Sequence, residues 1–235
     1  LGLYLNLLAF IAPKRAGNRA FQIFSYPFAT KLKPHQQQFL DSAKQRAVQF
    51  EGLRLATYTW GDGPERILCL HGWQSNAFRW KKFVQEADKD RYTVQCIDAP
   101  GHGNSEGTLL NVPVYARLVK QMLEMQTVDY ILGHSIGCFA AMYGMHDLTN
   151  QRPNRAVWIA APGSAEEFIG VFRSILGVNA RVERAMRSHF LESTGLDISD
   201  FLTERYAPKM QFPALIIHDR LDKEAPFHYA EQLHA

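Results

Sequence analysis

A serine stands at the centre of the pentapeptide Gly133-His134-Ser135-Ile136-Gly137, and its setting favours nucleophilic chemistry. The pentapeptide directly follows an apolar run at residues 130–132, which predicts a strand, and it opens an apolar segment at 138–146, which predicts a helix. A serine on such a tight strand-to-helix turn has strained backbone angles and exposes its hydroxyl above the sheet. Glycines on either side are expected where neighbouring chains pass too close for a Cβ atom. Ser135 is therefore predicted to be a nucleophile.

A serine hydroxyl is a poor nucleophile at neutral pH, so it needs a base, an acid that orients the base, and donors for the tetrahedral oxyanion. An apolar run at 67–70 ends at His71-Gly72-Trp73, where the glycine permits a tight turn. We expect the backbone amides of Trp73 and Ile136 to form the oxyanion hole. Trp73 and His134 are also expected to contact the substrate. His71 is expected to brace its loop through hydrogen bonds to the backbone.

A second loop, Asp98-Ala99-Pro100-Gly101-His102-Gly103-Asn104-Ser105, follows the apolar run at 92–97 and is expected beside the same crevice. Asp98 could serve as a catalytic acid. Two glycines and a proline around His102 instead describe a tight loop that is shaped by backbone demands. We therefore favour structural roles for both Asp98 and His102.

The elements that must position these residues are read from hydrophobic periodicity. Short apolar runs at 67–70, 92–97, 130–132, 156–160 and 214–217 predict strands that are buried on both faces, as in a parallel sheet. Segments with helical spacing at 78–87, 114–125 and 137–146 separate them, which predicts an α/β doubly wound domain. Residues 48–50 and 53–60 predict an antiparallel hairpin.

The interval between strands 156–160 and 214–217 is too long for one crossover helix. It contains helical patterns at 166–176, 181–191 and 198–206, so we expect a helical cap inserted at about 163–208. The domain organisation expected is an N-terminal helical extension over 1–47 and a single α/β domain over 48–235.

The three stretches HGW at 71–73, DAPGHGNS at 98–105 and GHSIG at 133–137 resemble, in the same order, the α/β-hydrolase superfamily. The resemblance covers roughly residues 48–235 and implies an α/β-hydrolase fold. It also implies that Asp222, after the last predicted strand, is the acid of a catalytic triad. Asp219 competes for that role, but it is expected to order the turn instead.

The reaction implied by the resemblance is hydrolysis of carboxylic esters with small or medium apolar acyl groups, through an acyl-enzyme on Ser135 and without a metal or organic cofactor. A small-molecule ester is the expected partner. A serine nucleophile argues against the dehalogenases and epoxide hydrolases of the family, which use aspartate. Two alternatives stay open, namely a thioesterase or acyltransferase on the same fold, and a non-catalytic protein that binds a ligand under its cap.

The base is where this sequence departs from the family pattern, in which the order is serine, acid, histidine. A helix, a strand and two connections after the acid need roughly 20 to 27 residues. Only 13 residues follow Asp222, so we expect the catalytic histidine, the final strand and the final helix beyond Ala235, with low stability and negligible hydrolysis in their absence. His228 and His234 are expected within a helix that begins near Phe227. His218 is expected to be structural.

Net charge and cysteine content limit the other function classes. A formal net charge of +3 argues against a nucleic-acid partner. Cys69, Cys96 and Cys138 lie in apolar runs with no metal-binding spacing, which indicates reduced core thiols and a cytoplasmic location.

The first twelve residues, LGLYLNLLAFIA, are almost wholly apolar but too few to span a bilayer. The favoured interpretation is a helix that packs on its own domain. The tail of a membrane anchor and a helix at a membrane interface are the alternatives, and both would make the protein membrane-associated.

Overall fold

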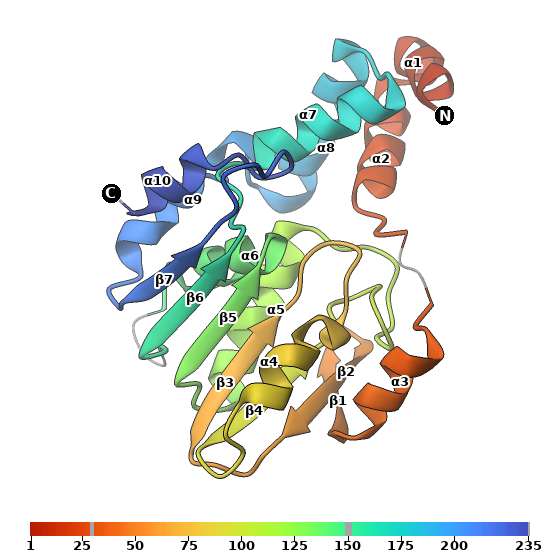
Figure 1. Ribbon diagram of the computed structural model, residues 1–235. Helices are drawn as coiled ribbons and strands as arrows, with labels where there is room; N and C mark the ends of the chain where they lie inside the picture. The colour runs from red at the N-terminus through yellow and green to blue at the C-terminus, as the bar shows by residue number, and fades with distance from the viewer. Residues whose placement is uncertain (29–30, 149–151, 235) are drawn as a thin grey trace. The chain divides into compact units, whose positions relative to one another are not determined.

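The computed structural model describes residues 1–28, 31–148 and 152–234. Its centre is a seven-stranded sheet with the strand order β1-β2-β4-β3-β5-β6-β7 (Figure 1). Strands β1, β2 and β4 pair antiparallel, and every other pair is parallel. This is the mostly parallel α/β-hydrolase sheet, with an antiparallel start, that the sequence predicts. The strands are β1 (Lys44–Phe50), β2 (Leu53–Trp60), β3 (Glu65–Leu70), β4 (Tyr92–Ile97), β5 (Tyr130–His134), β6 (Arg155–Ile159) and β7 (Ala214–Ile217).

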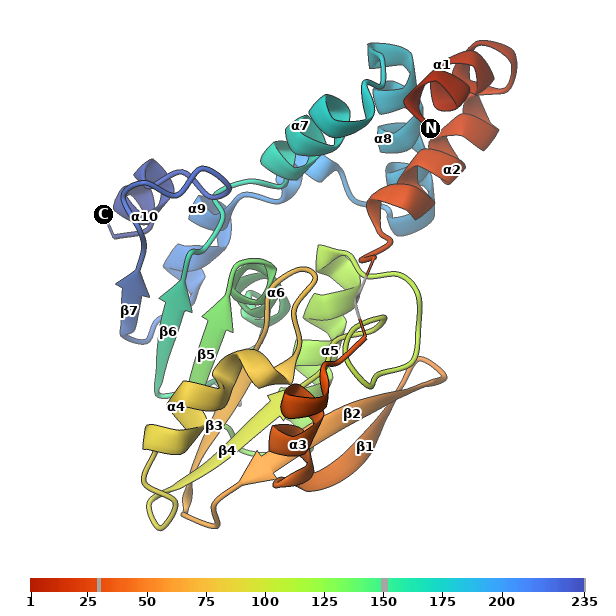
Figure 2. The ribbon, with the colours of Figure 1, turned by 45° about the vertical axis from the view of Figure 1, so that its right-hand side comes forward.

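Helices cover both faces of this sheet (Figures 1 and 2). Helices α5 (Val112–Met125) and α6 (Ile136–Met145) lie on one face, and Gly144 lets their backbones approach, since a Cβ there would lie 2.6 Å from the Ala116 carbonyl oxygen. Helices α3 (Pro34–Asp41), η1 (Ala77–Trp80) and α4 (Lys81–Glu86) lie on the other face. Leu40, Trp80 and Val84 bring these helices into the buried core formed with β2, β3 and β4. Helix α10 (His228–His234) follows β7 along the chain.

The hairpin begins earlier than the sequence indicates. Pairing starts at Lys44 opposite Thr59, four residues before the predicted start at Val48. Residues 44–47 are exposed on both faces because β1 is an edge strand, so they carry no alternation of apolar and polar side chains. This part of the strand is recognised from its backbone pairing with β2, and not from its side-chain pattern.

The chain divides into two compact units. The larger one holds residues 27–162 and 206–235 with the sheet, and the smaller one holds residues 1–26 and 163–205. The extension expected at 1–47 is therefore divided, because α3 and the start of β1 belong to the larger unit. The helices of the smaller unit are α1 (Gly2–Ile11), α2 (Pro13–Phe24), α7 (Ala165–Leu176), α8 (Ala180–Thr194) and η2 (Ile198–Asp200), and the short α9 (Thr203–Tyr206) lies at the boundary.

Aromatic contacts and a glycine join the N-terminal helices to the helices that the sequence assigns to the cap. Phe21 of α2 has ring centroids 5.6 Å from those of His189 and Phe190 on α8. Phe24 meets Phe172 of α7 edge-on at 5.5 Å. At Gly17 a Cβ atom would overlap the backbone of α8. The N-terminal helices thus share one core with α7 and α8.

No helix among the described residues is both long and apolar enough to cross a membrane.

Candidate active site

Ser135 occupies the turn between β5 and α6, with φ 51° and ψ −125°. Its backbone N–H donates to the Ile159 carbonyl of β6 at 2.9 Å, and its own carbonyl accepts from the Cys138 N–H at 2.9 Å. These two bonds fix a conformation that non-glycine residues rarely adopt. The side chain of Ser135 remains partly exposed at the carboxyl end of the sheet.

The two flanking glycines are required by close packing, as the sequence predicts. A Cβ at Gly137 would lie 2.6 Å from the Leu70 carbonyl oxygen and 2.8 Å from that of His71. A Cβ at Gly133 would lie 2.9 Å from the Cα of Cys138. Such distances are well below carbon and oxygen contact, so side chains at either position would displace the turn.

The loop after β3 lies directly against the serine. At Gly72 a Cβ atom would overlap the His134 ring and lie 3.2 Å from the Ser135 Cβ. The Trp73 amide follows in this loop, and the Ile136 amide begins α6. Within the described residues neither amide has a hydrogen-bond acceptor, which leaves both available to an oxyanion.

His71 has the bracing role expected from the sequence. Its Nδ1–H donates to the Gly72 carbonyl at 2.7 Å, and its Nε2 accepts from the Ala99 N–H at 2.9 Å. With both ring nitrogens engaged it ties the loop after β3 to the loop after β4. Burial lowers the pKa of His71 to about 4, so the imidazole is neutral at pH 7.

His102 is used in the same way. Its Nδ1–H donates to the Pro100 carbonyl at 2.9 Å, and its Nε2 accepts from the Gln74 N–H at 3.2 Å. Burial, with a smaller contribution from the neighbouring His71, lowers its pKa to about 4. The structural reading of His102 is confirmed, and its bond to Gln74 holds the residue that follows Trp73.

Asp98 is fully buried and accepts three hydrogen bonds within the protein. The donors are the Ala77 N–H at 2.7 Å, the Asn104 N–H at 2.9 Å and the Tyr58 hydroxyl at 3.1 Å. Burial raises the pKa of Asp98 even though these donors act against it. A carboxylate used in this way organises loops, which is the role favoured from the sequence.

Asp222 and Asp219 lie in the loop after β7. The Asp222 Oδ1 accepts from the amides of Glu224 at 2.8 Å and Ala225 at 2.9 Å, while its Oδ2 accepts no hydrogen bond among the described residues. Asp219 accepts from the Leu221 N–H at 2.9 Å and so orders the turn. Asp222 is therefore oriented by backbone and has one oxygen left for an external donor.

His218 braces the same loop through a 2.6 Å contact between its Nε2 and the Ala225 carbonyl. The Nε2 lies 3.9 Å from the Asp222 Oδ2, too far for a hydrogen bond. His228 and His234 lie on α10, as expected. Within the described part of the chain no histidine nitrogen hydrogen-bonds to the Ser135 hydroxyl.

Two features near Ser135 were not evident from the sequence. Burial, and to a smaller extent the charge of Arg79, lower the pKa of His134 to about 4. The Nδ1 atom of His134 is buried and has no hydrogen-bond partner among the described residues. The charge of Arg79, on η1, therefore acts on the ring of His134, the residue before Ser135. No motif marks this arginine, because its effect depends on how η1 packs.

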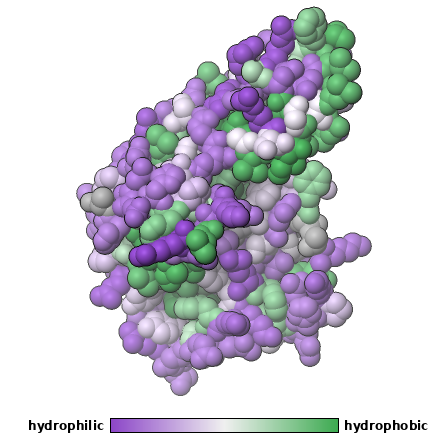
Figure 3. Space-filling model, turned by 45° about the horizontal axis from the view of Figure 1, so that its top comes forward, coloured by the Kyte–Doolittle hydropathy of each residue, from purple (hydrophilic) through white to green (hydrophobic). Residues whose placement is uncertain are grey.

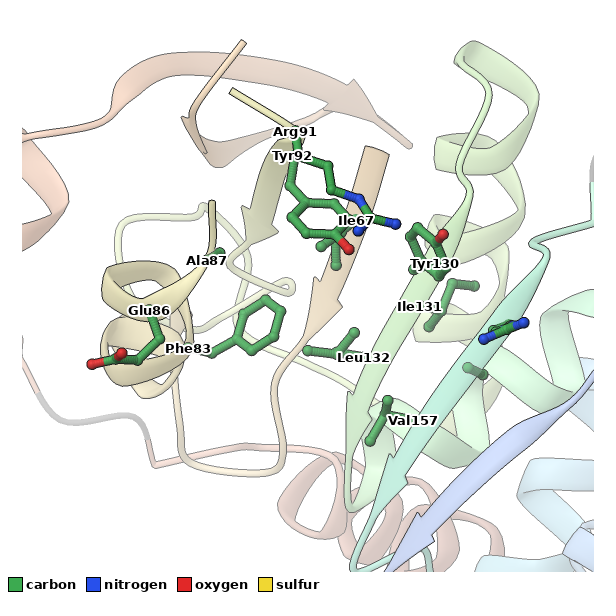
Figure 4. A pocket seen from close by; sticks show the side chains of 12 residues that line it. Ile67, Phe83, Glu86, Ala87, Arg91, Tyr92, Tyr130, Ile131, Leu132 and Val157 are labelled. Atoms are coloured by element: carbon green, nitrogen blue, oxygen red, sulfur yellow. The ribbon is translucent and has the colours of Figure 1, made fainter. Parts of the chain in front are cut away.

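A groove of about 360 Å³ lies elsewhere, on the sheet face beside α4. In Figure 4, Phe83 of α4 faces Leu132 and Val157 across it. Tyr130, the first residue of β5, also lines the groove, whereas Ser135 follows the last residue of that strand. None of the predicted catalytic residues lines this groove, so we do not place the reaction there.

The neutral buried histidines predict a pH-dependent stability. His71, His102 and His134 have folded-state pKa values of about 4, below the 6.5 expected when unfolded. The unfolded chain therefore binds more protons between these values, and the free energy of unfolding should fall as the pH drops from about 6.5 to 4. The largest contribution that the fully buried His71 can make to this fall in the free energy of unfolding is about 3 kcal/mol.

Asp98 has the opposite effect on the free energy of unfolding. Because its pKa is raised in the folded protein, the folded state binds a proton at Asp98 at a higher pH than the unfolded chain does. We expect the three histidines together to outweigh this single carboxyl group. Urea unfolding at several pH values between 7.5 and 4.5 measures the slope. A free energy of unfolding that stays constant over this range would contradict the buried neutral imidazoles.

Comparison with known proteins identifies the family. A model described as the alpha/beta hydrolase family matches residues 67–233, and the chain belongs to this family. A pimeloyl-(acyl-carrier protein) methyl ester esterase of Aeromonas hydrophila is 30% identical over 172 residues, which cover 64% of this chain and 65% of that protein. A serine hydrolase-like protein of Homo sapiens is 36% identical over 92 residues, covering 35% of this chain and 44% of that protein. The other curated relatives matched are covered over 20–36% of their own length.

Solved structures agree on the fold. A membrane phospholipase A has a TM-score of 0.63 at 18% identity, covering 85% of this chain and 77% of that one. The thioesterase domain from the curacin biosynthetic pathway has a TM-score of 0.60 at 13% identity, covering 82% of this chain and 88% of that one. At these identities the similarity concerns architecture, while the esterase-named sequence relatives support a hydrolase.

Proposed function

We propose that this protein is a serine hydrolase that cleaves carboxylic esters of small or medium apolar acyl groups through an acyl-enzyme on Ser135. The observation that carries the proposal is the position of Ser135 on a strained turn against the loop that contains Gly72 and Trp73, where the Trp73 and Ile136 amides have no acceptor in the described residues. The esterase-named relative from Aeromonas hydrophila supports ester chemistry.

In the proposed reaction the Ser135 Oγ attacks the ester carbonyl carbon while a base removes the hydroxyl proton. The amides of Trp73 and Ile136 stabilise the oxyanion, and the start of α6 adds the positive end of a helix dipole. The alcohol leaves with the proton held by the base. Water then attacks the acyl-enzyme, releases the carboxylic acid and restores the serine.

Asp222 is proposed to orient the base, because its Oδ1 is held by two amides and its Oδ2 can accept an imidazole N–H. The described residues place no histidine on Ser135, so free imidazole is a direct probe of this arrangement. We expect imidazole to raise the hydrolysis of p-nitrophenyl esters by the protein, beyond the background that imidazole produces alone. Esters of increasing acyl length, assayed in this way, would define the acyl preference.

In the described residues no histidine hydrogen-bonds to the Ser135 hydroxyl, and this observation is also compatible with a second candidate, a non-catalytic protein that binds an apolar ligand. The same assay separates the two. Ser135-dependent hydrolysis at any acyl length, with or without imidazole, supports the enzyme. If every ester is hydrolysed at the background rate under both conditions, the hydrolase proposal fails and ligand binding is left.

A further inference from the structure

Helix α1 presents a stripe of large apolar side chains to solvent. Its buried side consists of Gly2, Leu5 and Ala9, which recur at helical spacing and pack within the smaller unit. The opposite side would normally carry charged residues, but α1 contains none. We call this side the α1 stripe; it comprises Leu3, Tyr4, Leu7, Phe10 and Ile11, which are 53–84% exposed. Figure 3 shows hydrophobic side chains gathered at the upper right, where α1 lies in Figure 1.

Specific contacts hold α1 so that the stripe faces outward. The Gly2 backbone lies against the Leu176 carbonyl at the end of α7. The Asn6 side chain donates to the Gly177 carbonyl at 3.0 Å and accepts from the Asn179 N–H at 2.8 Å. Because these contacts fix the rotation of the helix, the stripe is a built surface of the smaller unit.

The smaller unit also carries exposed cations on α2 and α8, the helices that pack with α1. Lys14 and Arg15 lie in the first turn of α2, and Arg19 lies one turn further along that helix. The Arg181 guanidinium of α8 lies over the Phe10 ring, 4.3 Å from its centroid. The first 26 residues contain three cations and no aspartate or glutamate. We call these four residues the cationic rim.

We infer that the α1 stripe and the cationic rim together bind the surface of an anionic lipid bilayer. Apolar side chains beside lysine and arginine match the two layers of such a surface, acyl chains below and phosphates above. Aromatic residues such as Tyr4 and Phe10 favour that boundary. Because the side of α1 formed by Gly2, Leu5 and Ala9 stays packed on the smaller unit, the helix would lie in the plane of the interface with only the stripe in contact with lipid.

A second copy of the chain fits this surface less well. In a symmetric dimer the same patch meets itself, so two cationic rims would be brought together. Like charges at the edge of an interface oppose association, whereas anionic lipids are attracted by them. The charge of the rim therefore selects the bilayer as the partner.

The inference is tested with residues 1–235 in vesicle flotation. We expect binding to phosphatidylcholine vesicles that contain about 30 mol% phosphatidylglycerol, weaker binding to phosphatidylcholine alone, and weakening when salt rises from about 0.1 M to 0.5 M. The double variant Leu7→Glu/Phe10→Glu should reduce binding at least about tenfold, because it places charge in the stripe. Lys14→Gln/Arg15→Gln should reduce the binding to anionic vesicles by about fivefold for each charge removed.

Met125→Glu provides the matched control, because Met125 is an exposed apolar residue of the larger unit. This variant should bind to the vesicles as the wild type does. Circular dichroism checks that each variant is folded. Equal binding of the wild type and the Leu7→Glu/Phe10→Glu variant, or no binding to either vesicle, would overturn the inference. So would a dimer in sedimentation velocity that dissociates in that variant, because a second copy would then cover the stripe. None of these outcomes depends on ester hydrolysis.

Discussion

Replacing Ser135 by alanine is expected to lower ester hydrolysis to the background rate, a loss of about 10³-fold or more where a general base is in place, which is the usual size of a nucleophile deletion. The loss is expected because no acyl-enzyme can form on alanine, while the proposed oxyanion donors at Trp73 and Ile136 are backbone groups and remain. The rate is measured with p-nitrophenyl butyrate under the conditions, with or without imidazole, in which the wild type is active.

The fold should survive this change. The bonds that fix the turn are made by the Ser135 backbone, to Ile159 and from Cys138, and alanine keeps them. Urea unfolding should therefore give a midpoint close to that of the wild type. Ser174→Ala, at an exposed position of α7, is the matched control and should keep the wild-type rate. A Ser135→Ala protein with most of the wild-type rate would exclude Ser135 as the nucleophile.

Replacing Asp98 by alanine is expected to lower the free energy of unfolding by about 3 kcal/mol or more. The substitution leaves the buried Ala77 amide, the buried Tyr58 hydroxyl and the Asn104 amide without their acceptor. A buried donor without a partner costs about 1–3 kcal/mol, and removing a hydrogen-bonded charge costs more than removing an exposed one.

Urea unfolding at pH 7 measures this effect. Asp62→Ala is the matched control, because Asp62 pairs with Lys44 at the surface and should contribute under about 1 kcal/mol. Asp98→Asn should fall between the two, since its amide oxygen can replace part of the acceptor capacity. If Asp98→Ala is as stable as Asp62→Ala, the three hydrogen bonds do not support the loop as described.

Much of the architecture could be predicted because its signals are local. The apolar runs at 92–97 and 214–217 match β4 and β7 residue for residue, because a run of strand-forming residues between turns is a local signal. The expected burial of 214–217 on both faces is wrong, since β7 is an edge strand of the described sheet and its Leu215 and Ile217 are 59% and 46% exposed. The helices of the cap were expected within a few residues of α7 and α8, because their hydrophobic spacing is local. In the structure Ser164 and Asn179 cap their first turns, and Gly195 ends α8.

Other features could not be predicted because they depend on packing between distant segments. The first four residues of β1 carry no pattern, since an exposed edge strand is held by its partner and by little else. That α2 packs on α8, with Gly17 against the α8 backbone, follows from shape complementarity between segments about 170 residues apart.

At the candidate active site, too, some features follow from local sequence signals and others depend on packing. The sequence by itself determined that Ser135 stands on a strand-to-helix turn, since residue type, the two glycines and the flanking periodicity are all local and must agree for that turn to form. Tertiary structure alone decided what surrounds it: which donors Asp98 binds, which oxygen of Asp222 stays free, and that Arg79 lies near His134. These depend on burial and on distances between loops from different strands, and neither quantity is encoded at any single position of the chain.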